Sequence, residues 1–258
     1  MNSTYPSLVL DSHAPEYRRW EARCLAESLD CRLLSRIPDD SGLVLLFTAE
    51  RVELRNAGAP SGPVYCDFIH GSNAHRQRYG GGRGQALARA CGIKPGKTPS
   101  IIDATAGLGR DAWVLAVLGC ELHAIESNSF VHALLKDGLL RALDNPDGHV
   151  IASRIRLHHA DALASIPKLE PCDTIFLDPM FPGREKSASV KKEMRMLQHI
   201  VPTTTDETRL LDTARRHCLQ RVAVKRPAKS RPLANIPPHA SIPGKTTRFD
   251  LYTRLEEG

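Results

Sequence analysis

The chain has 258 residues, of which 41% are hydrophobic and 25% charged, and its formal net charge is +6. This is ordinary globular composition, and the length suits one large domain or a domain of about 200 residues with a smaller unit attached. No uncharged apolar run approaches the ~18 residues of a membrane span and no signal peptide opens the chain, so a soluble, cytoplasmic protein is expected. The basic excess favours a polyanionic partner without requiring one.

The first 70 residues have the pattern of a small α+β unit. Residues 15–34 space apolar side chains as a helix does, which predicts a helix with one apolar side. That side would carry Trp20, Cys24, Leu25 and Leu29. Short strands are predicted at 42–47 and 51–55, with a candidate third strand at 64–69.

From residue 71 to the end of the chain, strands alternate with helices. A glycine-rich segment at 75–84 leads into a helix at 85–90. Further strands are predicted at 100–103, 121–126, 155–158, 174–177, 221–225 and 247–252, with helices at 111–118 and 131–143. This alternation indicates a doubly wound, mostly parallel α/β sheet. We therefore predict a small unit at 1–70 and a sheet domain at 71–258.

A glycine-containing turn follows the first strand of this sheet, at the edge where doubly wound folds bind ligands. Gly107 and Gly109 let the chain turn sharply into a helix and bring backbone N–H groups close to a ligand. The next strand ends at Glu126, about twenty residues further on, which suits a carboxylate that accepts both ribose hydroxyls of a nucleoside. Asp103 before the turn and Asp161 after the third strand extend this series of strand-end acids.

The same turn also fits the fingerprint of nicotinamide and flavin dinucleotide sites, as Gly107-x-Gly109-x-x-Ala112. Three features favour S-adenosylmethionine (SAM) instead. Asp103 precedes the turn where a dinucleotide site usually stays apolar. Asp111 would repel a pyrophosphate but can hold the amino group of the methionine part of SAM. A dinucleotide fold also gives no reason for the sequence Asp-Pro-Met-Phe that follows the fourth strand.

Asp178-Pro179-Met180-Phe181 resembles the Asn/Asp-Pro-Pro-Tyr/Phe loop of amino methyltransferases, which modify exocyclic nitrogens of nucleobases. Such an amine is a poor nucleophile because its lone pair is delocalised into the ring. Asp178 and a carbonyl after Pro179 are predicted to accept its hydrogens and hold the nitrogen toward the methyl group. Pro179 stiffens this loop, and Phe181 is predicted to stack on the base. The ordinary alternative is a turn in which Asp178 caps the backbone and Phe181 fills the core.

Basic residues follow this motif directly. They include Arg184, Lys186, Lys191 and Lys192. Beside a base-binding loop they are predicted to neutralise RNA phosphates, although a solvated helix face would also explain them. Arg83 belongs to the segment 75–84, which mixes basic, aromatic and glycine residues and is either a second RNA contact or a linker. The histidines and the seven cysteines lack metal-ligand spacing, so no metal is expected.

Several of these segments together resemble the RsmJ (YhiQ) family of bacterial 16S rRNA guanine-N2 methyltransferases. They are residues 80–87, 103–112, 177–182, 186–195 and 224–227, so the likeness covers most of residues 75–230. It implies a class I (Rossmann-like) methyltransferase fold with SAM as the methyl donor. It also implies that the product is N2-methylguanosine in the 16S rRNA of the small ribosomal subunit.

The resemblance further assigns residues to the donor: Arg110, Asp111, Glu126, Ser127, Asp161, Ala162 and Asp178. Asp161 departs from the family, which has small hydroxyl residues there. Two other functions stay open, a nicotinamide-dependent oxidoreductase and a non-catalytic RNA-binding ribosome assembly factor. The first would bind NAD in place of SAM, and the second would bind RNA but no donor. Nothing in the sequence requires more than a monomer.

Overall fold

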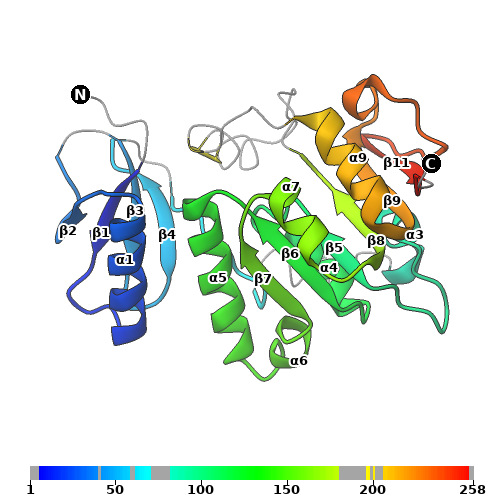
Figure 1. Cartoon of the computed structure of the whole chain (residues 1–258). Coiled ribbons are helices and arrows are strands. Elements are labelled where there is room, and N and C mark those ends of the chain that lie inside the picture. The colour runs from blue at the N-terminus through cyan, green and yellow to red at the C-terminus, as the bar shows by residue number, and fades with distance from the viewer. Residues whose placement is uncertain are drawn as a thin grey trace. The chain divides into compact units, whose positions relative to one another are not determined.

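The computed structural model describes residues 6–39, 42–58, 62–70, 82–179, 196–197, 200 and 206–255. The chain forms two compact units (Figure 1). Unit 1 comprises residues 1–66, 128–139 and 184–203, and unit 2 comprises residues 67–127, 140–183 and 204–258. In the described part of the chain, no helix is long and apolar enough to cross a membrane.

Unit 1 contains a four-stranded sheet with the strand order β2-β1-β3-β4. Its first elements are β1 (Ser7–Leu10), α1 (Glu16–Ser28), β2 (Leu33–Leu34), β3 (Leu43–Phe47) and β4 (Val52–Asn56). β1 runs parallel to β2 and β3, and β4 is antiparallel to β3. The register sets Leu8, Leu45 and Leu54 side by side on one face, where all three are fully buried. This face forms part of the core of unit 1.

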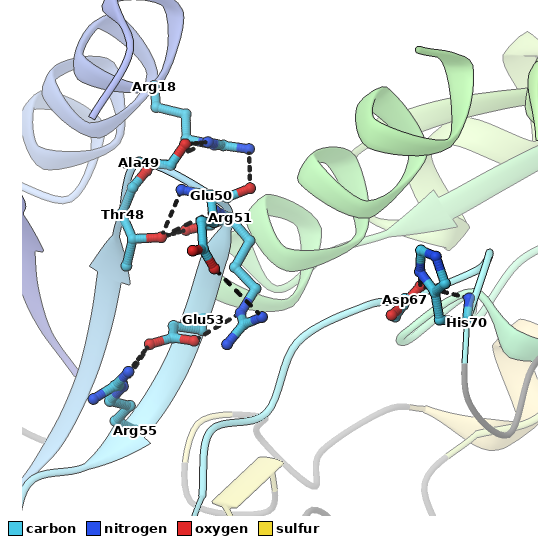
Figure 2. Close-up of polar contacts among 9 residues, drawn as sticks. All are labelled: Arg18, Thr48, Ala49, Glu50, Arg51, Glu53, Arg55, Asp67 and His70. Carbon is cyan, nitrogen blue, oxygen red and sulfur yellow. Dashed lines mark hydrogen bonds and ion pairs between the residues drawn. The ribbon is translucent and has the colours of Figure 1, made fainter. Parts of the chain in front are cut away.

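β4 shows the alternation that the sequence predicts for this strand. Val52 and Leu54 are buried on one face, and the charged residues point to the other. There, the buried Glu53 accepts hydrogen bonds from Arg51 and Arg55, which lie two residues away on either side (Figure 2). The strand and the residue before it therefore carry three charged side chains on one face, and the buried carboxylate of Glu53 is paired with both arginines.

Helix α1 buries only part of the predicted apolar side, in which Leu25 and Leu29 are half-buried. Its buried residues are Arg18, Ala22 and Ala26, spaced by four, whereas Trp20 is 63% exposed. The prediction included Trp20 because it is the largest apolar side chain of the helix, and it is wrong for this residue. Small alanines at helical spacing let the helix approach its neighbours closely, and the large aromatic side chain remains in solvent.

Arg18 is the charged residue of this buried side. Its Nε lies 2.8 Å from Oδ1 of Asp137, on α5 (Ser129–Leu143). Its guanidinium also donates to the backbone carbonyls of Thr48, Ala49 and Glu50, which belong to the β3–β4 turn (Figure 2). One arginine thus joins α1 to a turn and to a helix from the middle of the chain.

Three further boundaries in this unit differ from the prediction. The helix predicted at 15–34 ends at Ser28, and residues 33–34 form β2 instead. The candidate strand at 64–69 is not a strand, because only Val64 pairs with Leu54, in an isolated bridge. β1 was not predicted, since four residues with two buried side chains give too short a pattern to detect.

Unit 2 contains a seven-stranded mixed sheet with the order β10-β11-β9-β8-β5-β6-β7. The strands are β5 (Ile101–Asp103), β6 (Leu122–Glu126), β7 (Ile155–His159), β8 (Cys172–Leu177), β9 (Cys218–Pro227), β10 (Ala240–Ile242) and β11 (Thr247–Thr253). β5 to β9 pair in parallel, and β11 is antiparallel to both β9 and β10. The predicted mostly parallel α/β sheet with a smaller N-terminal sheet is confirmed.

Helices cover both faces of this sheet. They are α3 (Ala86–Ala90), α4 (Arg110–Val117), α6 (His149–Ala152), α7 (Ala162–Ser165) and α9 (Glu207–His217), with 3-10 turns η1 (Gly82–Gly84), η2 (Ile166–Lys168) and η3 (Leu233–Asn235). Ile101 packs in one core cluster with Leu115 of α4, while the next residue, Ile102, packs in the other with Leu211 of α9. Successive strand residues point to opposite faces, so the short β5 contributes to both halves of the core.

Candidate functional site

The carboxyl ends of four parallel strands bring acidic residues to one edge of the sheet in unit 2. Asp103 is the last residue of β5 and Glu126 the last of β6. Asp161 lies two residues beyond β7, and Asp178 follows β8 directly. β5 lies between β6 and β8, so the direction of strand succession reverses there. In doubly wound sheets this reversal opens the crevice in which ligands bind.

The turn between β5 and α4 depends on two glycines with left-handed backbone. The φ angle is 54° at Gly107 and 72° at Gly109, which is the residue that caps the N-terminus of α4. Residues with a Cβ atom rarely adopt this conformation. The N–H of Gly107 donates to Oε2 of Glu126 at 2.9 Å, and the N–H of Ala106 donates to the carbonyl of Ile125 at 3.0 Å. These bonds fix the turn against the end of β6.

Lys225 of β9 contacts two of the carboxylates. The parallel register of β8 and β9 pairs Leu177 with Val224, so the next residues, Asp178 and Lys225, come level with each other. Lys225 Nζ lies 2.7 Å from Oδ2 of Asp178 and 2.5 Å from Oδ2 of Asp111, in the first turn of α4. The ammonium group therefore links the start of α4 to the segment after β8.

The three charged side chains differ in their access to solvent. Asp111 is 10% exposed, Lys225 28% and Asp178 36%. Thr105 adds a contact from the glycine turn, because its Oγ1 accepts a hydrogen bond from the N–H of Asp178 at 2.6 Å. Asp178 is thus held through its backbone and its side chain while it remains the most accessible member of the group.

The crowding of carboxylates shifts their protonation equilibria. Burial raises the pKa of Asp103 to about 8, and the negative charges of Asp111 and Asp178 also act to raise it. The N–H of Thr105 donates a hydrogen bond to the Asp103 carboxylate at 3.2 Å, and this bond acts to lower the pKa. Burial also raises the pKa of Asp178, and the ammonium of Lys225 opposes this rise. Burial alone would lower the pKa of Lys225, but the two carboxylates raise it above its ordinary value. At neutral pH, Asp103 is therefore mainly protonated and Lys225 is charged.

The other predicted donor residues lie around this centre. Arg110 and Ser127 are exposed, directly after the glycine turn and after β6. Asp161 caps α7, where its Oδ1 accepts from the N–H of Ala164 at 3.1 Å, and Ala162 is the first residue of that helix. Each follows the carboxyl end of a strand or the turn beside it, as the sequence predicts.

Of the predicted acceptor and RNA-contacting residues, Pro179 is half-buried directly after Asp178. Arg83 is exposed in η1. Burial raises the pKa of Cys120, and the charge of Arg83 opposes this rise. Because Cys120 lies before the amino end of β6, Arg83 is not among the side chains gathered at the carboxyl ends of the strands. The remaining predicted residues lie outside the described part of the chain: Phe181, Arg184, Lys186, Lys191 and Lys192.

The sequence places Lys225 at the end of a strand on this edge, but it predicts neither the two carboxylate contacts of Lys225 nor a role for Thr105. Lys225 ends the predicted strand 221–225 and belongs to segment 224–227 of the family resemblance, and its register with Asp178 is the signal that identifies its role. The next residue, Arg226, lies on the other face of β9, where it donates to the carbonyl of Arg231 and lies 3.7 Å from Glu207. Adjacent basic residues of one strand therefore have different environments.

The residues of this edge suit a cationic nucleoside better than a dinucleotide. Glu126 is a carboxylate at the end of a strand, and the turn presents backbone N–H groups at the start of α4. Asp111 and Asp178 provide negative charge where a pyrophosphate would be repelled and where the ammonium and sulfonium groups of SAM would be attracted. The chemistry of these side chains thus fits SAM. Within the described residues, no group of three or more His, Cys, Asp or Glu side chains is arranged to hold a metal ion.

Known proteins resemble this chain over most of its length. Residues 29–254 match the protein family described as "Putative SAM-dependent methyltransferase". Ribosomal RNA small subunit methyltransferase J of Yersinia pseudotuberculosis is 48% identical over 217 residues, which cover 83% of this chain and 85% of that protein. The protein of the same name from Yersinia pestis has the same identity and coverage.

A solved structure extends this likeness to both units. The crystal structure of a SAM-dependent methyltransferase from Neisseria gonorrhoeae is 35% identical and aligns with a TM-score of 0.78 over 98% of this chain and 97% of that one. The similarity is therefore not confined to the glycine turn, which many nucleotide-binding folds share.

Proposed function

The chain belongs to the ribosomal RNA small subunit methyltransferase J family, and from this we propose that it transfers the methyl group of SAM to the exocyclic N2 of a guanine in 16S rRNA. The observation that supports the reaction most directly is the position of Asp178. This carboxylate follows β8, beside the central strand β5, and is the most accessible of the three charged side chains. It is thus available to an amine that enters from solvent.

On the donor side, the strand-end residues would hold SAM. Glu126 would accept the ribose hydroxyls, and Asp111 together with the N–H groups after Gly107 and Gly109 would hold the methionine end. Asp161 and Ala162 would contact the adenine, and Asp103, Arg110 and Ser127 would complete the donor site. Bound SAM supplies an electrophilic methyl group on its sulfonium. The chain's own contribution is to orient this group and to neutralise its charge.

On the acceptor side, Asp178 would accept a hydrogen of the guanine amine. This hydrogen bond turns the nitrogen lone pair toward the methyl group and offsets the positive charge that develops on nitrogen as the C–N bond forms and the C–S bond breaks. S-adenosylhomocysteine is the leaving group, and the methylated nitrogen then releases one proton to solvent. Pro179 limits the freedom of the loop, and Phe181 is proposed to stack on the base. The reaction needs neither a metal ion nor a covalent bond to the protein.

The proposed substrate explains the basic excess of the chain. Arg184, Lys186, Lys191 and Lys192 follow the acceptor loop in sequence and would neutralise phosphates near the target base, with Arg83 as a further contact. A ribosomal substrate implies that the enzyme acts in the bacterial cytoplasm, and we propose that it acts as a monomer.

The test is a methyl-transfer assay with isotopically labelled SAM on unmodified small ribosomal subunits and on their deproteinised RNA. Nucleoside mass spectrometry then identifies the product, which we expect to be N2-methylguanosine. Asp178→Ala should keep donor binding within a few-fold and reduce turnover by about 10²-fold, the usual effect of losing one preorganised electrostatic partner. Asp147→Ala removes an exposed carboxylate between α5 and α6 and serves as the matched control.

Two results would count against the proposal. Label in another nucleoside, or in none, would exclude guanine N2 as the acceptor. A turnover of Asp178→Ala close to that of the wild type and of Asp147→Ala would exclude Asp178 from the reaction.

A further inference from the structure

The contacts of Lys225 set it apart from the other basic side chains of unit 2. Its Nζ lies within 2.7 Å of one carboxylate that belongs to the donor side of the site, Asp111, and of one that belongs to the acceptor side, Asp178. These two residues are 67 positions apart in sequence, so only the fold brings them to one cation. An ammonium group is suited to this position because it is a compact charge with three donors that can serve two carboxylates at once.

The backbone around Lys225 restricts where its side chain can go. Lys225 pairs with Phe249 of β11 and lies two residues after Ala223, which points to the same face of the sheet. Phe249 and Ala223 both belong to the buried apolar cluster on that face. The side chain thus leaves a packed strand at a defined point, and its charged end reaches the two carboxylates.

We propose that Lys225 is a positioning residue of the methyl-transfer reaction, which bridges Asp178 to Asp111 and so holds the Asp178 carboxylate in one orientation and in its charged form. This inference rests on the proposed function, in which Asp178 accepts a hydrogen of the acceptor amine. Lys225 itself acts through Asp178 and needs no contact with the base.

The charges that face Asp178 show why such a residue is required. Burial and the carboxylate of Asp111 on α4 both disfavour a negative charge on Asp178, and Lys225 on β9 compensates for them. Arg226 lowers the pKa of Asp178 as well, but its guanidinium donates to the carbonyl of Arg231 on the other face of the strand. A protonated Asp178 would present a hydrogen to an amine that also presents hydrogens, and one of its acceptor positions would be lost.

The same bridge suits the donor. Two carboxylates and one ammonium leave one net negative charge beside the position proposed for a cationic ligand, and Asp103 adds little because it is mainly protonated at neutral pH. Lys225 itself repels a cation. Its removal should therefore leave SAM affinity within a few-fold of that of the wild type, whereas loss of a direct donor contact would weaken it.

The first experiment measures the protonation of Asp178 without any ligand. Aspartate labelled with carbon-13 at the side-chain carboxyl is titrated by NMR in the donor-free protein, and the Asp178 signal is assigned with Asp178→Asn. In Lys225→Met the pKa of Asp178 should rise by about one unit or more, the usual effect of losing an adjacent opposite charge. In Lys225→Arg the pKa of Asp178 should stay close to that of the wild type, because the positive charge is kept. Lys97→Met removes an exposed lysine before the amino end of β5 and should leave the titration unchanged.

The second experiment follows methyl transfer over a range of pH. Lys225→Met should reduce kcat by about 10²-fold near neutral pH, and the acidic limb of its pH profile should move to higher pH by the amount that NMR measures. Lys225→Arg should return the limb toward that of the wild type. A lysine that only supported the fold would scale the whole profile without moving this limb.

An Asp178 titration that is the same in Lys225→Met and in the wild type would overturn the proposal, and so would a kcat of Lys225→Met within two-fold of the wild type. A wild-type protein that binds SAM but methylates no small-subunit RNA would instead overturn the proposed function. The two failures are therefore distinguishable.

Discussion

At the scale of single residues, the buried carboxyl of Asp103 has a consequence for stability. It is 1% exposed, and burial raises its pKa to about 8. In the unfolded chain the pKa of an aspartate is about 4, so the folded protein keeps a proton that the unfolded chain releases. The stabilising contribution of this group is therefore complete below about pH 4 and is lost as the pH rises through about 8.

We predict that donor-free Asp103→Asn loses less stability than the wild type as the pH rises from about 5 to 8, because the substituted amide has no proton to release. Urea denaturation at each pH measures the free energy of unfolding of both proteins. Curves that run parallel over this range would show that Asp103 titrates in the folded protein as it does in the unfolded chain.

At the scale of elements, α1 provides the sharpest contrast between size and burial. Arg18→Met should lower the free energy of unfolding by about 3–5 kcal/mol, because Asp137 stays buried but loses the opposite charge of the Arg18 guanidinium. Trp20→Ala should change it by less than about 0.5 kcal/mol, because the side chain is 63% exposed. Denaturation by urea compares the two variants.

A double variant provides the control for this ranking. Arg18→Met combined with Asp137→Leu removes both charges together, and we expect it to be more stable than Arg18→Met alone. If Trp20→Ala were the more damaging single change, the predicted apolar side of α1 would be the buried one after all.

Strand β4 was easier to predict than this helix. The alternation at 51–55 gave β4 nearly residue by residue, because the period of a strand separates charged from apolar side chains even when one charge, that of Glu53, is buried. In α1 the buried arginine breaks the rule that charged residues face solvent, and it can do so only because carbonyl groups and a carboxylate receive it.

At the scale of the whole molecule, the charge is unevenly divided along the chain. Acidic residues outnumber basic ones in residues 1–66, so the net charge of +6 comes from the remainder. We predict that the affinity for small-subunit RNA falls steeply with salt. If the five proposed basic residues each neutralise one phosphate, the slope of log affinity against log salt is about −3 to −4 for single-stranded contacts.

Replacing Lys191 and Lys192 by glutamine should make this slope shallower by about 1 to 1.5. Fluorescence anisotropy with labelled RNA at several salt concentrations measures it, and calorimetry with SAM should show no comparable change. A slope that is unaltered in the double variant would place the phosphate contacts elsewhere on the protein.

The sequence by itself determined the parts of this protein that depend on neighbouring residues. The glycine turn, the acid at the end of each strand and each predicted strand or helix are recognised from residues a few positions apart, because short-range stereochemistry governs them. The Asp-Pro-Met-Phe segment is equally short and is recognised by its resemblance to a known loop. The tertiary structure decided which distant residues meet. Arg18 and Asp137 are 119 positions apart, and Lys225 and Asp111 are 114 apart. Such pairs depend on helix packing and on the register between strands, and no local pattern records either.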